Sequence, residues 1–297
     1  MKAWIAAARP RTLPLALASI ILGSFLAASV GRFSWLTFTL AALTTIFLQI
    51  LSNFANDYGD AVSGKDTPDR VGPRRAVATG DLTKEAMFKA ILVTALLSLV
   101  SGVWLLIEAT RESGAWLFWV FLILGLLCIA AAVAYTNGKR PYGYAGYGDI
   151  AVLVFFGWVG VLGTYFLHTQ SLGTWLLLPA SAVGFFATGV LNINNVRDIE
   201  TDAKTGKHSI PVRLGRKRAV RYHWLLLISG MACALVYSLL TASDWSAYLY
   251  VLSFPLFVLN GRAVENHTNP AELNPRLGQL ALSTLVFVLL FGLGVVL

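Results

Sequence analysis

Nine apolar segments of near membrane-crossing length constrain this chain more than any other feature. A helix needs roughly 20 apolar residues to cross about 30 Å of hydrocarbon, and lipid leaves no partner for the unpaired backbone of an open sheet. Of the 297 residues 57% are apolar and 13% are charged, so an all-α polytopic membrane protein is expected, with one domain over 1–297. The predicted spans are 13–28, 38–55, 90–107, 116–134, 150–167, 175–191, 224–240, 247–259 and 277–297.

The basic residues orient these predicted helices. Lys and Arg are retained on the cytoplasmic side of membrane proteins. If the N-terminus lies inside, every Lys and Arg except Arg32 and Arg111 falls on the cytoplasmic side. This distribution predicts a cytoplasmic N-terminus and an outer C-terminus. It also accounts for the net charge of +8 without a nucleic-acid partner, because the charges lie in the links between apolar segments.

Most of the acidic residues lie in two long cytoplasmic links, at about 53–88 and 192–222. Long ordered connections often carry function. In the first link, Asn56 and Asp60 are one helical turn apart, and Asp57 is three residues from Asp60. If the helix continues through them, the three side chains share one face.

The second link repeats this arrangement. Asn194, Asp198 and Asp202 follow one another at intervals of four residues, and the same 138 residues separate Asn56 from Asn194 and Asp60 from Asp198. Stacked carboxylates at the mouth of a membrane bundle repel one another, so a cation should accompany them. Oxygen ligands without His or Cys favour Mg²⁺, which commonly bridges carboxylates to phosphates. The alternative is that these are ordinary helix-end acids paired with nearby Lys and Arg.

At these motifs the chain resembles the UbiA superfamily of aromatic prenyltransferases, which carry N-D-x-x-D-x-x-x-D and D-x-x-x-D motifs. The resemblance covers the whole chain and is strongest to the branch that prenylates 1,4-dihydroxy-2-naphthoate for menaquinone synthesis. The stretches that carry it are RPRTLP at 9–14, NDYGD at 56–60, GKD at 64–66, RPYGY at 140–144, GD at 148–149, LNINN at 191–195 and RD at 197–198.

The resemblance implies roles for the residues of both motifs. The family expects an Asp four residues beyond Asp60, where this chain has Gly64, and Asp66 is the nearest substitute. Asp57, Asp66 and Asn194 are implied in supporting positions around the metal and diphosphate. The implied catalytic and magnesium-binding residues are Asn56, Asp60, Asp198 and Asp202.

Basic side chains are needed for the departing diphosphate and for the carboxylate of the acceptor. Arg140, beside Tyr142 and Tyr144, is a candidate for the acceptor, although these residues also fit an interfacial belt. Arg9 and Arg11 either contact the aromatic substrate or flank the first helix. Segments 72–75 and 209–215 are either lids or turns. The candidate diphosphate donors are Lys139, Lys204, Lys207 and Arg75.

The implied reaction is Mg²⁺-dependent transfer of a polyprenyl group, expected to be octaprenyl, from its diphosphate to an aromatic acid within the lipid bilayer. The expected location is the inner membrane, multi-pass, with the active site facing the cytoplasm. The nearest alternative in the superfamily is prenylation of 4-hydroxybenzoate for ubiquinone. A transporter is the alternative from another class, but the acidic residues cluster at one surface and not at the bilayer midplane.

Overall fold

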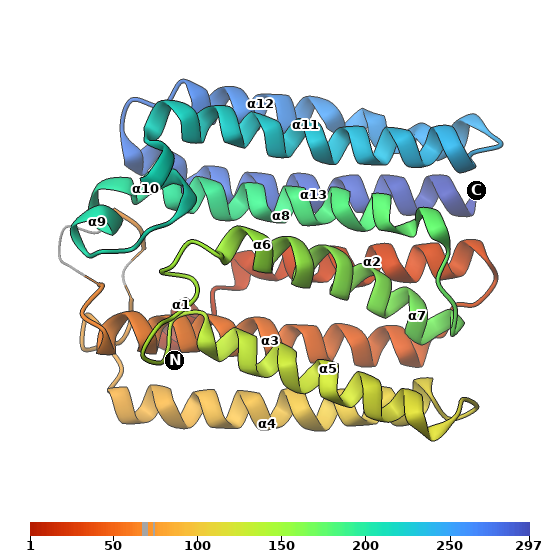
Figure 1. Cartoon of the computed structure of the whole chain (residues 1–297), viewed down its shortest axis with the longest axis horizontal. Coiled ribbons are helices and arrows are strands. Elements are labelled where there is room, and N and C mark those ends of the chain that lie inside the picture. The colour runs from red at the N-terminus through yellow and green to blue at the C-terminus, as the bar shows by residue number, and fades with distance from the viewer. Residues whose placement is uncertain (67–70, 74) are drawn as a thin grey trace.

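The structure is a computed structural model that describes residues 1–66, 71–73 and 75–297, and it is a bundle of long helices (Figure 1). Within these residues nine helical segments are long and apolar enough to cross a membrane, which confirms the predicted number and the all-helical class. The spans are Lys2–Ser29, Trp35–Val62, Lys84–Ala109, Ala115–Ala134, Gly148–Thr169, Thr174–Arg197, Arg216–Thr241, Trp245–Glu265 and Pro270–Val296.

Several spans are assembled from consecutive helical pieces. Four spans are single helices, and two short helices lie outside the spans. The single helices are α3 (Trp35–Val62), α4 (Lys84–Ala109), α5 (Ala115–Ala134) and α11 (Arg216–Thr241), and the short ones are α9 (Ile199–Lys204) and α10 (Ile210–Leu214). The pieces are α1 (Lys2–Ala8), η1 (Pro10–Thr12) and α2 (Leu13–Ser29); α6 (Gly148–Val152), η2 (Leu153–Leu162) and α7 (Gly163–Thr169); η3 (Thr174–Leu176) and α8 (Leu177–Arg197); η4 (Trp245–Ser253) and α12 (Phe254–Glu265); and η5 (Pro270–Leu273) and α13 (Asn274–Val296).

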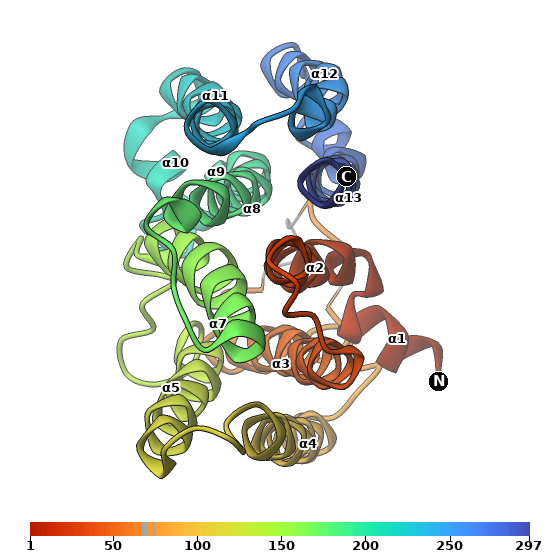
Figure 2. The same ribbon diagram turned by 90° about the vertical axis from the view of Figure 1, so that its right-hand side faces the viewer.

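The helices run side by side, and both acidic motifs lie at one end of the bundle. Figure 1 shows α9 and α10 at the same end as the start of α4 and the end of α8, whereas the C-terminus of the chain lies at the opposite end. We call these the motif end and the far end. Figure 2 looks along the bundle from the far end and shows α11, α12 and α13 grouped on one side and α3, α4 and α5 on the other.

Helix α3 carries the first motif because it continues beyond the apolar run. Ser34 caps its start by accepting a hydrogen bond from the backbone N–H of Thr37. The apolar pattern ends near Ala55, but the helix continues to Val62. Asn56 and Asp60 are therefore held on a rigid element and not in a loop.

The fifth span contains a π-helical stretch, η2, that lines the interior of the bundle. π-Helical turns are rare and widen the backbone ladder. Ser19 on α2 donates a hydrogen bond of 2.5 Å to the carbonyl of Phe156. On the other side η2 approaches α8 closely, because a Cβ added to Gly157 would lie 2.9 Å from the Cα of Gly184. Glycine at both positions allows this contact.

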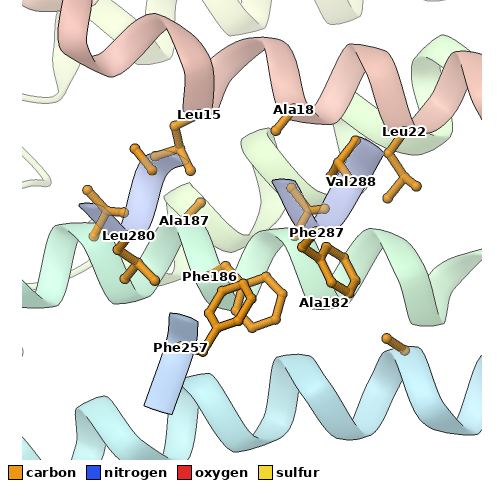
Figure 3. Packing of buried hydrophobic residues seen from close by; sticks show 14 of the residues in the cluster. Leu15, Ala18, Leu22, Ala182, Phe186, Ala187, Phe257, Leu280, Phe287 and Val288 are labelled. Atoms are coloured by element: carbon orange, nitrogen blue, oxygen red, sulfur yellow. The ribbon is translucent and has the colours of Figure 1, made fainter. Parts of the chain in front are cut away.

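A large cluster of buried apolar side chains joins α2, α8, α12 and α13 with the neighbouring helices. Phe186 of α8 stacks on Phe257 of α12, with ring centroids 4.1 Å apart, and meets the edge of Phe287 at 5.1 Å. Figure 3 shows these rings together with Leu15 and Leu22, side chains of α2 in the same cluster. This packing fixes the four helices against one another.

The contact of α2 with the fifth span depends on Gly23. A Cβ at this position would lie 2.5 Å from the carbonyl oxygen of Val161 and 2.8 Å from the Cβ of Thr164. We expect Gly23→Ala to lower the thermal unfolding temperature of the detergent-solubilised protein, because backbone must move and overpacking costs about 1–3 kcal/mol. Gly278→Ala is the matched control on α13, where an added Cβ meets no atom within 4 Å. Equal melting of the two variants would contradict the expected clash.

Candidate functional site

A cavity of about 470 Å³ extends from the motif end into the bundle, between α2, α3, α4, α5, η2, α7 and α8. Its lining changes from polar to apolar along its length. The charged and amide side chains at the motif end include Asn56, Asp60, Arg75, Asn194, Asn195, Asp198, Asp202 and Lys207. The apolar part is lined by residues that include Leu105, Leu106, Phe121, Leu122, Phe155, Phe156 and Leu167.

Asp60 is the centre of the first motif. Its side chain is 1% exposed and contacts three groups from three segments. The guanidinium of Arg75 lies 2.5 Å from Oδ2, the ammonium of Lys207 lies 3.1 Å from Oδ1, and the hydroxyl of Tyr144 donates to Oδ1 at 2.5 Å. Charge-assisted contacts of this kind are short and strong. The carboxylate is therefore fixed in orientation although it is buried.

The second motif lies where α8 gives way to α9. Asp198, at φ −98° and ψ 11°, ends α8 and precedes α9. Arg197 grips its carboxylate through Nε at 2.8 Å and Nη2 at 2.6 Å. The same Nη2 donates to the side-chain oxygen of Asn194 at 2.8 Å. Asn194, Asp198 and Asp202 all line the cavity, so the four-residue repeat does place them together.

Lys207 joins the two motifs. Its Nζ lies 3.1 Å from Asp60 and 3.9 Å from Asp202, although these carboxylates are 142 residues apart in the sequence. The backbone N–H of Lys207 also donates to the carbonyl of Asp202 at 2.9 Å. The two motifs therefore converge on one positive charge.

Tyr144 belongs to the link between α5 and α6 and completes this group. Its ring lies under the ammonium groups of Lys207 and Lys65, at 5.0 and 5.9 Å from the centroid. Burial, together with the negative charge of Asp60, raises the pKa of the Tyr144 hydroxyl above its usual value. The hydroxyl consequently stays protonated at neutral pH and donates to Asp60.

Hydrogen bonds to backbone carbonyls connect the three links at the motif end, which follow α3, α5 and α8. His208 donates from its N–H to the carbonyl of Tyr144 at 2.8 Å, and the guanidinium of Arg213 donates to the carbonyl of Ala145 at 2.6 Å. Lys65 donates to the carbonyl of Thr205. Of the segments predicted as lids or turns, Arg75 and Ser209 line the cavity, whereas Arg74 lies outside the described residues.

The chemistry of the polar lining fits Mg²⁺. Across the described ranges no three His, Cys, Asp or Glu side chains form a metal-ligating group. Two carboxylates, Asp60 and Asp202, already converge on one cation, and the amide oxygens of Asn56 and Asn194 are close by in the lining. Mg²⁺ usually takes one or two carboxylates together with water and substrate phosphates. A preformed cage of three carboxylates is not required.

The structure does not bring every predicted residue to the cavity. Asp57 lies on α3, but its carboxylate accepts hydrogen bonds from the backbone N–H groups of Ala76 and Val77, at 3.1 and 3.2 Å. Asp66 lies 3.3 Å from Nε of Arg75, next to the lining. The side chains that are exposed and outside the cavity lining are Lys139, Arg140 and Lys204.

Arg9 has two alternative roles in the sequence analysis, and the structure places it at the cavity. It lies between α1 and η1 with φ 50°, a left-handed conformation that is uncommon for a residue with a side chain. It lines the main cavity and also a second one of about 430 Å³ that Lys2 and Arg11 share. Left-handed non-glycine residues cluster at functional sites. The RPRTLP string allows both a substrate contact and a topology role for Arg9 and favours the topology role.

Two residues of the site have no predicted role in it from the sequence. Tyr135 lines the cavity, and burial raises the pKa of its hydroxyl. Arg197 is part of the RD string and a possible ion-pair partner of the motif acids, and the structure shows that it orients Asp198. Both are positioned by the packing of the helix ends, which no local pattern encodes.

Comparison with known proteins identifies the family. The UbiA prenyltransferase family matches residues 16–283. A relative named 1,4-dihydroxy-2-naphthoate octaprenyltransferase from Escherichia coli (strain K12) is 46% identical over 99% of this chain and 95% of its own length, and one of the same name from Mycobacterium tuberculosis is 38% identical over 96% and 94%.

Solved structures share the fold. A UbiA homolog from Aeropyrum pernix K1 superposes with a TM-score of 0.71 at 16% identity over 96% of each chain. A UbiA homolog from Archaeoglobus fulgidus bound to DMAPP and Mg²⁺ gives 0.64 at 16% identity, over 99% of this chain and 98% of that one. The family match covers most of the sequence, so this chain is a prenyltransferase and belongs to the UbiA prenyltransferase family.

Proposed function

We propose that this enzyme transfers an octaprenyl group from octaprenyl diphosphate to 1,4-dihydroxy-2-naphthoate with loss of CO₂ and diphosphate, as in menaquinone synthesis. The observation that carries the proposal is that the polar end of the cavity continues directly into its apolar part. Asp60 and Asp202 meet Lys207 at the polar end, and a space lined by Leu105, Phe121 and similar side chains continues from there. A diphosphate with a long apolar chain matches both ends, and the names of the relatives match the acceptor.

The donor reacts by breaking the bond between its first prenyl carbon and the diphosphate oxygen, and the electron pair leaves with the diphosphate. Asn56, Asp60, Asp198 and Asp202 would hold Mg²⁺, which would supply charge neutralisation for the diphosphate. Lys207 and Arg75 donate hydrogen bonds to the negative charge as it develops, which is the usual logic of a preorganised electrostatic site. The apolar walls keep water from the allylic cation.

The acceptor attacks through the ring carbon that bears its carboxyl group. A carbon–carbon bond to the prenyl group forms, the carboxyl leaves as CO₂, and its bonding electrons return to the ring. Of the basic residues predicted for the acceptor, Arg9 lines the cavity, whereas Arg140 is exposed. We assign the acceptor carboxylate to Arg9. The motif end faces the cytoplasm in this proposal, because the links at that end carry nearly all the Lys and Arg residues.

The test is to supply membranes containing the enzyme with Mg²⁺, octaprenyl diphosphate and an acceptor labelled in its carboxyl group. With 1,4-dihydroxy-2-naphthoate we expect prenylated naphthoquinol and stoichiometric labelled CO₂, both abolished by a chelator and restored by Mg²⁺. Product from 4-hydroxybenzoate alone would reassign the acceptor to the ubiquinone pathway. A prenylated product that keeps its label would refute the decarboxylation.

A further inference from the structure

We propose that Gly125 and Gly163 determine how long a prenyl chain the cavity accepts, because they leave open the cross-section through which the chain must pass. The inference rests on the proposed function and extends it to the length of the donor. Both glycines line the cavity, on α5 and α7 respectively. A Cβ added at either position would meet no atom within 4 Å.

Both glycines lie on helix faces that line the cavity. Phe121, Gly125 and Cys128 line the cavity at intervals of four and three residues, which places them on one face of α5. Gly160, Gly163 and Leu167 do the same on the fifth span. The neighbouring Leu127 is 56% exposed and is outside the lining, so it marks the lipid side of α5.

The two glycines lie at the same depth. Phe121 of α5 stacks on Phe166 of α7, with ring centroids 5.2 Å apart. Gly125 is four residues from Phe121 towards the motif end, and Gly163 is three residues from Phe166 in the same direction. At about 1.5 Å per residue, both glycines therefore lie about 5 Å from this aromatic pair in the direction of the motif end, on different walls of the cavity. A side chain at either position would narrow the same level.

This level is several isoprene units below the diphosphate site. Thr136 donates to the side-chain oxygen of Asn56 at 3.1 Å, so the two residues mark one height. Gly125 is eleven residues from Thr136, or about 16 Å along the helix axis. An extended isoprene unit spans about 5 Å by its bond lengths. A geranyl chain of two units therefore ends between the diphosphate site and Gly125, whereas an octaprenyl chain must extend past Gly125.

The test compares donors of two lengths in the complete enzyme. The readout is the ratio of kcat/KM for octaprenyl diphosphate to that for geranyl diphosphate. We expect Gly125→Phe and Gly163→Phe each to lower this ratio about tenfold or more, the scale on which a filled apolar pocket discriminates. Leu127→Phe adds the same bulk to the lipid side of α5 and should leave the ratio at the wild-type value. Wild-type ratios in both glycine variants would overturn the inference.

A second readout separates this inference from the identity of the acceptor. A ligand that binds the native state raises its melting temperature according to its affinity. With Mg²⁺ and a donor alone, octaprenyl diphosphate should stabilise the wild type more than geranyl diphosphate does, and Gly125→Phe should remove that difference. If this holds while 1,4-dihydroxy-2-naphthoate is not prenylated, the proposed function is wrong but the length determinant stands. If Gly125→Phe does not fold, Gly125→Val and Gly163→Phe provide the same test.

Discussion

Asp60→Asn is expected to reduce prenyl transfer by at least about 100- to 1000-fold, the range typical for loss of one preorganised electrostatic group. The amide keeps the size of the side chain but removes the charge that Arg75 and Lys207 share and that the proposed Mg²⁺ would bind. The rate should fall at saturating Mg²⁺ as well, because extra metal does not restore the lost ligand. Single-turnover transfer from octaprenyl diphosphate measures the effect.

Asp81→Asn is the control for this substitution. Asp81 lies in the same link but is exposed. Its carboxylate accepts a hydrogen bond from the hydroxyl of the nearby Thr79. We expect its rate to equal that of the wild type. Full activity of a folded Asp60→Asn enzyme would remove Asp60 from the metal and diphosphate site.

Arg197→Met is expected to have the largest effect on stability. Arg197 is buried, and its guanidinium joins Asp198, Asn194 and, at 3.0 Å, Asn274 of α13. Removing one partner of a buried ion pair costs about 3–5 kcal/mol, because the remaining charge stays in a low-dielectric site. The melting temperature in detergent should fall clearly, and activity should fall with it because Asp198 loses its orientation.

Arg216→Met serves as the comparison. Arg216 pairs with Glu200 at 3.6 Å and contacts the ring of His267 at 3.0 Å, but the ion pair is much more exposed than that of Arg197, at 37% and 78%. Exposed pairs contribute about 0–1 kcal/mol, so this variant should melt close to the wild type. Arg197→Lys should recover only part of the loss, since an ammonium cannot bridge the carboxylate with two parallel bonds. Similar melting of the Arg197 and Arg216 variants would contradict the buried-pair assignment.

The number of spans could be predicted from the sequence because it depends on one-dimensional information. Apolar runs and the basic residues between them are visible without any knowledge of packing. Helix ends were less accessible: 38–55 was predicted where α3 runs from Trp35 to Val62. The end of α3 cannot be located from apolar periodicity, because the helix continues into the polar motif, where its side chains have partners.

The carboxylate motifs could be predicted because their spacing matches the helix period, but their cationic partners could not be ranked. The sequence does not distinguish between the four candidate diphosphate donors, Lys139, Lys204, Lys207 and Arg75. Which of them reaches the carboxylates depends on how the links fold. Arg75 and Lys207 reach Asp60, while the other two are exposed. The roles assigned to these residues remain predictions.

Asp57 illustrates the same limit within a motif. Helical spacing placed it on the face of Asp60, yet its carboxylate binds two backbone N–H groups of the following link. A position three residues away on a helix is rotated by about 60°, which is enough to direct a side chain to another neighbour. The carboxylate thereby holds Ala76 and Val77, and with them Arg75, in place.

Three of the contacts that join the links at the motif end are accepted by main-chain carbonyls, at Tyr144, Ala145 and Thr205. A carbonyl oxygen is supplied by every amino acid, so these three contacts place no demand on the identity of the residue that accepts them. Amino-acid replacements at Ala145 and Thr205 can therefore accumulate while the closed arrangement of the links persists. Sequence drift in these links is compatible with an unchanged architecture around the reacting groups.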